Sequence, residues 1–241
     1  MTLFLASVRD SAEADMALLA GADVIDLKEP GRGALGALDP EALVACVASV
    51  GGRRAVSATI GDLPLDGPGV RDAVRETASA GVDFVKVGLF PGARPEACLS
   101  LLKDESARAR LILVLFADAL PAFDAISVAA EIGAHGVMLD TADKGSGSLL
   151  AHMSLGEVAD FVGAARLEGL TAGLAGSLKA ADIVPLLALE PELLGFRGAL
   201  CREGARRGAV DKLACRRIRA LIPPASGARP HRTEPRASAL C

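Results

Sequence analysis

Short apolar runs alternate with longer stretches of helical periodicity along most of the chain. The apolar runs are rich in Val, Ile and Leu, which is typical of strands buried on both faces of a parallel sheet. The longer stretches open on Asp, Ser or Pro, the residues that start helices, and Asp10 or Ser11 and Asp39 are the first such caps. Strands are predicted over residues 3–8, 24–28, 54–60, 84–87, 111–116, 136–139, 171–175 and 193–197. Helices are predicted over residues 11–20, 40–50, 70–80, 95–106, 121–132, 154–168, 180–189 and 209–221.

Eight strand–helix units are the number found in a (β/α)8 barrel. The alternation alone also fits a doubly wound sheet. The number of units, the length of 241 residues and the glycine turns favour the barrel. We therefore predict one α/β domain, a single-domain (β/α)8 TIM barrel over residues 1–222. Residues 223–241 change to Pro, Ala, Ser and Arg without periodicity and are predicted to be a disordered tail.

Composition narrows the classes of function. Hydrophobic residues make up 51% of the chain, enough for a large core, but Trp and Tyr are absent. Without them there is little aromatic surface for stacking on bases or for a membrane interface, and a net charge of −4 gives no general attraction to nucleic acid. No apolar run reaches the roughly 18 residues that cross a bilayer. We expect a cytoplasmic protein with no nucleic-acid or membrane partner.

The sequence gives little support for a metal site or a dinucleotide-binding site. The five cysteines are scattered, and no Cys or His lies near another at the spacing of a metal site. We expect reduced thiols, histidines in packing or surface roles, and neither a metal nor another cofactor. The pattern Gly31-x-Gly33-x-x-Gly36 formally matches a dinucleotide fingerprint, but the next helix opens only at Asp39, so this reading is rejected.

The second predicted strand carries an acid and an amine two residues apart. Asp26 and Lys28 share one face of it, because strand side chains alternate. Charged groups in an apolar sheet are costly unless they have a function. The arrangement recurs with Lys86 on the fourth strand and with Asp140 and Lys144 at the end of the sixth.

Barrel enzymes carry their active sites at the C-terminal ends of the strands. This sequence concentrates polar residues and glycines there, whereas the N-terminal ends offer mainly Gly and Ala, with Asp83. The residues at the C-terminal ends are Asp26, Lys28, Ser57, Thr59, Asp62, Lys86, Gly88, Asp118, Asp140, Lys144, Gly176, Ser177, Arg197 and Gly198.

Lysines in such positions suit carbonyl chemistry. An ordinary lysine has a pKa near about 10.4 and is a poor nucleophile at neutral pH. Burial and a neighbouring cation lower that pKa and expose the amine that forms a Schiff base. Because alternate strands contribute to one layer inside a barrel, Lys28 and Lys86 can face each other, one neutral and one protonated. The alternative is a buried Lys–Asp network that only holds the barrel together.

The loops after the seventh and eighth strands are candidates for phosphate binding through backbone N–H groups. Glycine allows close approach of the backbone, and Ser177 is placed to cap the next helix. Gly-Ser is also common at ordinary strand–helix turns, so the loops alone do not decide the matter. The candidate phosphate- and substrate-binding residues are Ser57, Thr59, Gly176, Ser177, Arg197 and Gly198.

Taken together, these motifs resemble those of the (5-formylfuran-3-yl)methyl phosphate synthase family. The similarity extends from Met1 to about Leu221, except around the fifth strand, where the segment Ala107–Phe123 looks shorter than in the family and leaves the role of Asp118 open. The motifs that carry it are Gly21–Pro30, Gly33–Ala37, Val56–Asp62, Phe84–Leu89, Met138–Ala142 with Lys144, Gly173–Leu178 and Gly195–Ala199.

The resemblance implies a TIM-barrel lyase of methanofuran biosynthesis. Such an enzyme condenses two glyceraldehyde 3-phosphate molecules into 4-(hydroxymethyl)-2-furancarboxaldehyde phosphate, with loss of phosphate and water. By motif, Lys28 is the expected Schiff-base lysine and Lys86 the general acid/base, with Asp26, Asp140 and Lys144 in support. The division of labour between Lys86 and Lys144 stays open.

The expected enzyme is cytoplasmic, metal-independent and a homo-oligomer, and the similar bacterial enzymes belong to methylotrophs. Two other functions are compatible with the same residues. One is a class I aldolase-like phosphosugar lyase on the same barrel. The other is a non-catalytic barrel that binds a phosphate ligand.

Overall fold

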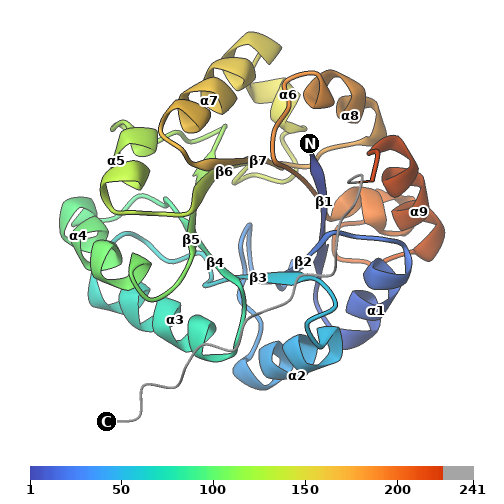
Figure 1. Ribbon diagram of the computed structural model, residues 1–241, viewed down its shortest axis with the longest axis horizontal. Coiled ribbons are helices and arrows are strands. Elements are labelled where there is room, and N and C mark those ends of the chain that lie inside the picture. Colours follow the sequence, from blue (N-terminus) through green and yellow to red (C-terminus); the bar gives the residue numbers. More distant parts are fainter. Residues whose placement is uncertain (225–241) are drawn as a thin grey trace.

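The computed structural model describes residues 1–224, and these form a closed barrel of eight parallel strands. Each strand pairs with the next one in the sequence, and β8 returns to β1, with Phe4 opposite Leu194. Figure 1 shows the strands as an inner ring and the helices as an outer ring. The strands are β1 (Leu3–Val8), β2 (Val24–Leu27), β3 (Ala55–Thr59), β4 (Phe84–Gly88), β5 (Leu111–Phe116), β6 (Gly136–Asp140), β7 (Thr171–Leu174) and β8 (Leu193–Phe196). The sequence-based prediction of a (β/α)8 barrel is confirmed.

The helices that cover the barrel agree with the predicted ones to within a few residues. They are α1 (Ser11–Leu19), α2 (Pro40–Val50), α3 (Pro68–Ser79), α4 (Pro95–Ser106), α5 (Ala125–Glu131), α7 (Leu155–Leu167), α8 (Ala180–Leu187) and α9 (Lys212–Leu221). Three short segments escaped prediction: the helix α6 (Leu149–His152) and the 3-10 turns η1 (Gly198–Leu200) and η2 (Arg202–Gly204). All three lie in loops at the C-terminal ends of β6 and β8.

Helix starts were the least accurate part of the prediction. The helix expected from residue 121 begins at Ala125, because the Asp124 carboxylate accepts hydrogen bonds from the N–H groups of Ile126 and Ser127. Asp10 caps α1 as expected, by accepting from the N–H of Glu13. Asp39 precedes α2 but makes no side-chain cap, since its carboxylate pairs with Arg32 instead.

Apolar side chains fill two separate layers. The larger layer lies between the helices and the outer face of the barrel, and the smaller one fills the barrel interior. β5 serves both layers, and all six of its residues, LILVLF, are buried. Such continuous burial is the reason a parallel barrel strand reads as an uninterrupted apolar run. The interior layer consists of Leu5, Val24, Ala34, Leu35, Ile112, Val114, Phe116, Met138 and Ala175.

Strand register explains where the polar interior begins. Ser7 on β1 lies opposite Asp26 on β2, and Asp26 lies opposite Ser57 on β3. Two residues earlier along each of these strands stand Leu5, Val24 and Ala55, three of the apolar residues of the lower barrel. The interior therefore changes from apolar to polar at one level, which forms the floor of a site open toward the C-terminal ends of the strands.

The predicted tail over residues 223–241 falls almost entirely on residues 225–241, which lie outside the described part of the chain. Among residues 1–224, no helix combines the length and apolar character needed to cross a bilayer.

Candidate active site

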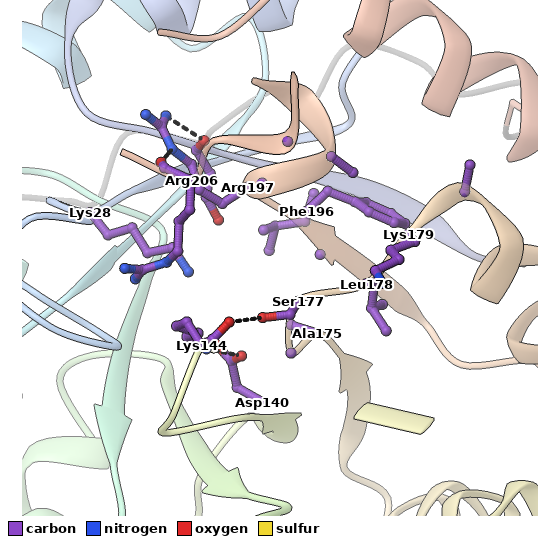
Figure 2. A pocket seen from close by; sticks show the side chains of 18 of the residues that line it. Lys28, Asp140, Lys144, Ala175, Ser177, Leu178, Lys179, Phe196, Arg197 and Arg206 are labelled. Carbon is purple, nitrogen blue, oxygen red and sulfur yellow. Dashed lines mark hydrogen bonds and ion pairs between the residues drawn. The ribbon is translucent and has the colours of Figure 1, made fainter. Parts of the chain in front are cut away.

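A cavity of about 500 Å³ opens at the C-terminal ends of the strands. Its lining includes the three lysines expected from the sequence, together with Asp140 and both candidate phosphate loops. Figure 2 shows Lys28 and Arg206 on one side of this cavity, Lys144 with Asp140 below them, and Lys179 toward the far side. The cationic lining residues are Lys28, Lys86, Lys144, Lys179, Arg197 and Arg206, against one carboxylate, Asp140. The surplus of positive charge suits an anionic ligand.

Asp26 anchors the floor of the cavity. Its carboxylate is fully buried and accepts hydrogen bonds from the Ser7 hydroxyl at 2.7 Å and the Ser57 hydroxyl at 2.6 Å. The Lys86 ammonium donates to the same carboxylate at 3.0 Å. Burial by itself raises the pKa of Asp26, but the charges of Lys86 and Lys28 and the two hydroxyl donors outweigh it and lower the pKa below its ordinary value. Asp26 is therefore ionised, and it fixes Lys86 in place.

Lys28 is the unusual amine of the site. Its side chain is 5% exposed and makes no hydrogen bond or salt bridge among the described residues. Burial lowers the pKa of Lys28, Asp140 and Asp26 oppose that shift, and Lys86 and Lys144 add to it, which leaves the pKa at about 7. A large part of Lys28 is therefore neutral near pH 7, as a nucleophilic amine must be.

One carboxylate oxygen of Asp140 is hydrogen-bonded and the other has no partner in the described part of the chain. Its Oδ1 accepts hydrogen bonds from the Lys144 ammonium and from the N–H of Thr141, the latter at 2.8 Å. Its Oδ2 is buried and has no hydrogen-bond partner among the described residues. Burial raises the pKa of Asp140, but the charges of Lys144 and Lys28 lower it to about 2. Asp140 lines the cavity, and this buried, ionised oxygen is an unsatisfied acceptor beside it.

The two candidate phosphate loops line the same cavity as Lys28. Gly176 adopts φ +96°, and a Cβ there would lie 3.1 Å from the backbone nitrogen of Thr141, so only glycine fits. Ser177 follows in the left-handed region at φ +47°, a strained conformation for a residue with a side chain. Ser177 does not cap α8 as expected; Lys179 holds the cap position, and the Ser177 hydroxyl donates to the Lys144 carbonyl at 3.3 Å.

Arg197 lines the cavity, but its guanidinium is committed elsewhere. It forms a buried ion pair with Glu13 of α1, and it also donates to the carbonyls of Ser7, Arg206 and Gly208. The pair joins the loop after β8 to the first helix. Backbone N–H groups at Gly198, rather than this guanidinium, are then the donors available to a ligand at the β8 loop.

Two of the predicted binding residues lie apart from the cavity. Ser57 and Thr59 are both 2% exposed and do not contribute to its lining. Ser57 holds Asp26, as described above. Thr59 donates to the Gly36 carbonyl at 3.0 Å and so supports the glycine-rich loop that follows β2. Both residues therefore support the site from outside the cavity.

Two carboxylates that follow strands shape the neighbouring loops. Asp62 accepts from the N–H groups of Ala34 and Leu35, at 2.8 and 2.7 Å. A Cβ on Gly33 would lie 2.0 Å from Asp62 Oδ2, so the contact requires a glycine. Asp118, whose role the sequence left open, accepts in the same way from Ala142 and Asp143, both at 2.7 Å. It fixes the β6 loop that carries Lys144.

Sequence reasoning missed Ser7, Glu13, Lys179 and Arg206. Ser7 is an isolated hydroxyl at the end of an apolar strand, and Glu13 reads as an ordinary helix residue. Arg206 lies in the irregular segment between β8 and α9, where no periodicity marks it. Only Lys179, which follows the Gly176-Ser177 loop directly, carried a signal in the sequence. Among residues 1–224 no group of three or more His, Cys, Asp or Glu side chains is placed to hold a metal ion.

The barrel and this cavity define a (β/α)8-barrel protein with a lysine-lined candidate site that favours anions. A model of the 4-HFC-P synthase family matches residues 4–219. The chain belongs to this family of enzymes.

Relatives align over most of the chain. A protein of Methylorubrum extorquens is 45% identical over 207 residues, 86% of either chain. The (5-formylfuran-3-yl)methyl phosphate synthase of Methanopyrus kandleri is 36% identical over 86% of this chain and 92% of its own. That of Methanococcus maripaludis is 33% identical over 87% and 94%.

Solved structures support the fold alone. Phosphoribosyl anthranilate isomerase from Thermotoga maritima superposes with a TM-score of 0.67 at 13% identity, covering 90% of this chain and 97% of its own. A 3-hexulose-6-phosphate synthase gives a TM-score of 0.60 at 18% identity, covering 92% and 100%.

Proposed function

We propose that this enzyme condenses two molecules of glyceraldehyde 3-phosphate into 4-(hydroxymethyl)-2-furancarboxaldehyde phosphate through a Schiff base on Lys28, as a step of methanofuran-type cofactor biosynthesis. The observation that carries the proposal is the pKa of Lys28, about 7, in a cavity with a surplus of cations and two glycine-rich loops. The names of the relatives support the product. A cytoplasmic, homo-oligomeric enzyme, in methylotrophic metabolism, remains the expectation from the sequence.

The proposed reaction begins on Lys28. Its neutral amine adds to the carbonyl carbon of one triose phosphate, and the carbonyl oxygen leaves as water. The resulting iminium acidifies the neighbouring C–H bond, and the unpartnered Oδ2 of Asp140 accepts that proton to give an enamine. The enamine expels the phosphate from C3 of the same triose, and C3 then adds to C2 of the second triose phosphate, which has isomerised to its keto form. The Lys86 ammonium protonates the new alkoxide.

The remaining steps are hydrolysis and ring closure. Water hydrolyses the iminium and frees Lys28, and ring closure with loss of two water molecules gives the furan. Atom balance from two triose phosphates requires one phosphate and two water molecules to leave in total, with no oxidant or reductant. Asp26 supports this sequence by holding Lys86 in place, and Lys144 orients Asp140.

Purified enzyme incubated with glyceraldehyde 3-phosphate is expected to release one inorganic phosphate for each molecule of furan aldehyde formed. The conjugated furan aldehyde absorbs strongly in the near ultraviolet, so the spectrum and a phosphate assay measure both products in one reaction. A class I aldolase would instead give an adduct without this absorption and without free phosphate. Binding without any turnover would identify a non-catalytic phosphate-binding barrel. Either result contradicts the proposal.

The nucleophilicity of Lys28 is expected to rise as the pH increases through about 7, since only the deprotonated amine reacts. The substrate phosphate also titrates near pH 6, so the rate of acetylation of Lys28 in the free enzyme is the cleaner measurement. Peptide mass spectrometry from pH 5 to 9 gives that rate, with the exposed Lys103 of α4 as an internal reference. A midpoint for Lys28 above pH 9 would remove the basis for its assignment.

A further inference from the structure

A second cavity, of about 620 Å³, lies beside the first, between the loops that follow β2, β3, β6 and β8. Lys144 and Arg206 line both cavities and so stand at the boundary between them. The second cavity also receives Arg207, which is exposed and makes no side-chain hydrogen bond or ion pair among the described residues. The catalytic and phosphate-binding roles proposed for the first cavity do not explain the second one.

The charges that face the second cavity favour an anion. Its two carboxylates are already engaged by backbone N–H groups: Asp62 by Ala34 and Leu35, and Asp143 by Gly145 at 2.8 Å. The three cations are less fully compensated. Lys144 pairs with Asp140, whereas Arg206 and Arg207 make no ion pair with a carboxylate within residues 1–224.

Hydrogen bonds fix Arg206 in place and leave some of its N–H donors unused. Its Nη1 donates to the Pro30 carbonyl, and its Nη2 to the carbonyls of Gly33 and Ala34. These bonds use at most three of the five guanidinium N–H groups, which leaves at least two without a partner in the described residues. Burial lowers the pKa of Arg206, with Asp140 opposing, so the guanidinium is a desolvated cation that a bound anion stabilises.

We propose that Arg206, Arg207 and Lys144 form a second phosphate subsite, which binds the phosphate of the second triose phosphate. The assignment to that substrate rests on the proposed function, because a condensation of two phosphorylated aldehydes needs two anion sites within reach of one lysine. The loops after β7 and β8 take one phosphate in the first cavity, which Lys28 also lines. The second cavity adjoins it at Lys144 and Arg206, adds Arg207, and offers the second site.

Calorimetric titration with glycerol 3-phosphate tests the subsite, since this probe has the phosphate of the substrate but no carbonyl to react. Wild-type enzyme is expected to bind two equivalents per chain. R207Q is expected to weaken the second binding event about ten- to a hundredfold and leave the first unchanged. R206Q is expected to weaken the second event to a similar extent and also to affect the first, because Arg206 lines both cavities. R207Q avoids the risk that R206Q loosens the glycine-rich loop. R202Q is the matched control, because Arg202 lies in the same loop but lines neither cavity.

One equivalent bound by the wild type, or two equivalents bound with unchanged affinity by R207Q and R206Q alike, would overturn the subsite. This outcome is separable from failure of the proposed function. Glycerol 3-phosphate binds without chemistry, so Lys28→Ala is expected to retain both equivalents. If two equivalents bind but no furan product forms, the second subsite is supported and the proposed condensation is wrong.

Discussion

We expect turnover of glyceraldehyde 3-phosphate to fall at least about a thousandfold when Lys28 is replaced by alanine. The reason is chemical: the substitution removes the amine that forms the covalent intermediate. Lys86 is bound to Asp26 and Lys144 to Asp140, so neither side chain is free to take its place. Phosphate release and furan absorbance, followed together, measure the loss.

The fold of Lys28→Ala is expected to persist, because the lysine makes no hydrogen bond or salt bridge whose loss would leave a partner stranded. Binding of glycerol 3-phosphate and an unchanged circular dichroism spectrum check this point. Lys103→Ala, on the exposed surface of α4, is the matched control and should keep full activity. If Lys28→Ala turns over substrate within about tenfold of the wild type, Lys28 is not the nucleophile.

Replacing Lys86 by methionine is expected to affect both stability and catalysis. The change leaves Asp26, which is fully buried, without its cation, and an uncompensated buried charge costs about 3–5 kcal/mol of unfolding free energy. The Ser7 and Ser57 hydroxyls still donate to the carboxylate but do not neutralise it. Activity is expected to be lost as well, since the proton donor to the new alkoxide is gone. Urea unfolding and the product assay give the two quantities.

The double variant Asp26→Asn with Lys86→Met separates the two effects. An asparagine at position 26 is neutral and can still hydrogen-bond to both serine hydroxyls, so most of the lost stability should return. Catalysis should not return, because the ammonium is still absent. A double variant that is as unstable as Lys86→Met alone would show that the pair does not balance charge in the folded protein. A double variant with restored activity would remove Lys86 from the mechanism.

The barrel and its catalytic face were predictable from the sequence because both depend on short-range periodicities. Alternation along β2 put Asp26 and Lys28 on one face, and the ends of β4 and β6 placed Lys86 and Asp140 at the same edge. The strand count then supplied the geometry, since parallel strands of a barrel bring their carboxyl ends together.

Contacts between residues far apart in the sequence could not be predicted from short-range periodicities. Arg197 ends β8 like a ligand-binding residue, yet its guanidinium pairs with Glu13, 184 positions earlier in the chain. Arg206 spans a similar distance to hold the carbonyl of Pro30. No local pattern encodes either contact, because each arises only when the barrel closes and β8 pairs with β1. Helix starts were misplaced for a more local reason, the competition among several Asp, Ser and Pro residues for one cap.

Borohydride reduction of the enzyme in the presence of glyceraldehyde 3-phosphate, followed by peptide mass spectrometry, tests the central claim most directly. Reduction converts the iminium into a stable secondary amine and so records which lysine carried the substrate. The expected result is one triose phosphate adduct, on the peptide that contains Lys28, and none in Lys28→Ala. An adduct on Lys86 or Lys144 in the wild type, or undiminished labelling of Lys28→Ala, would contradict the account.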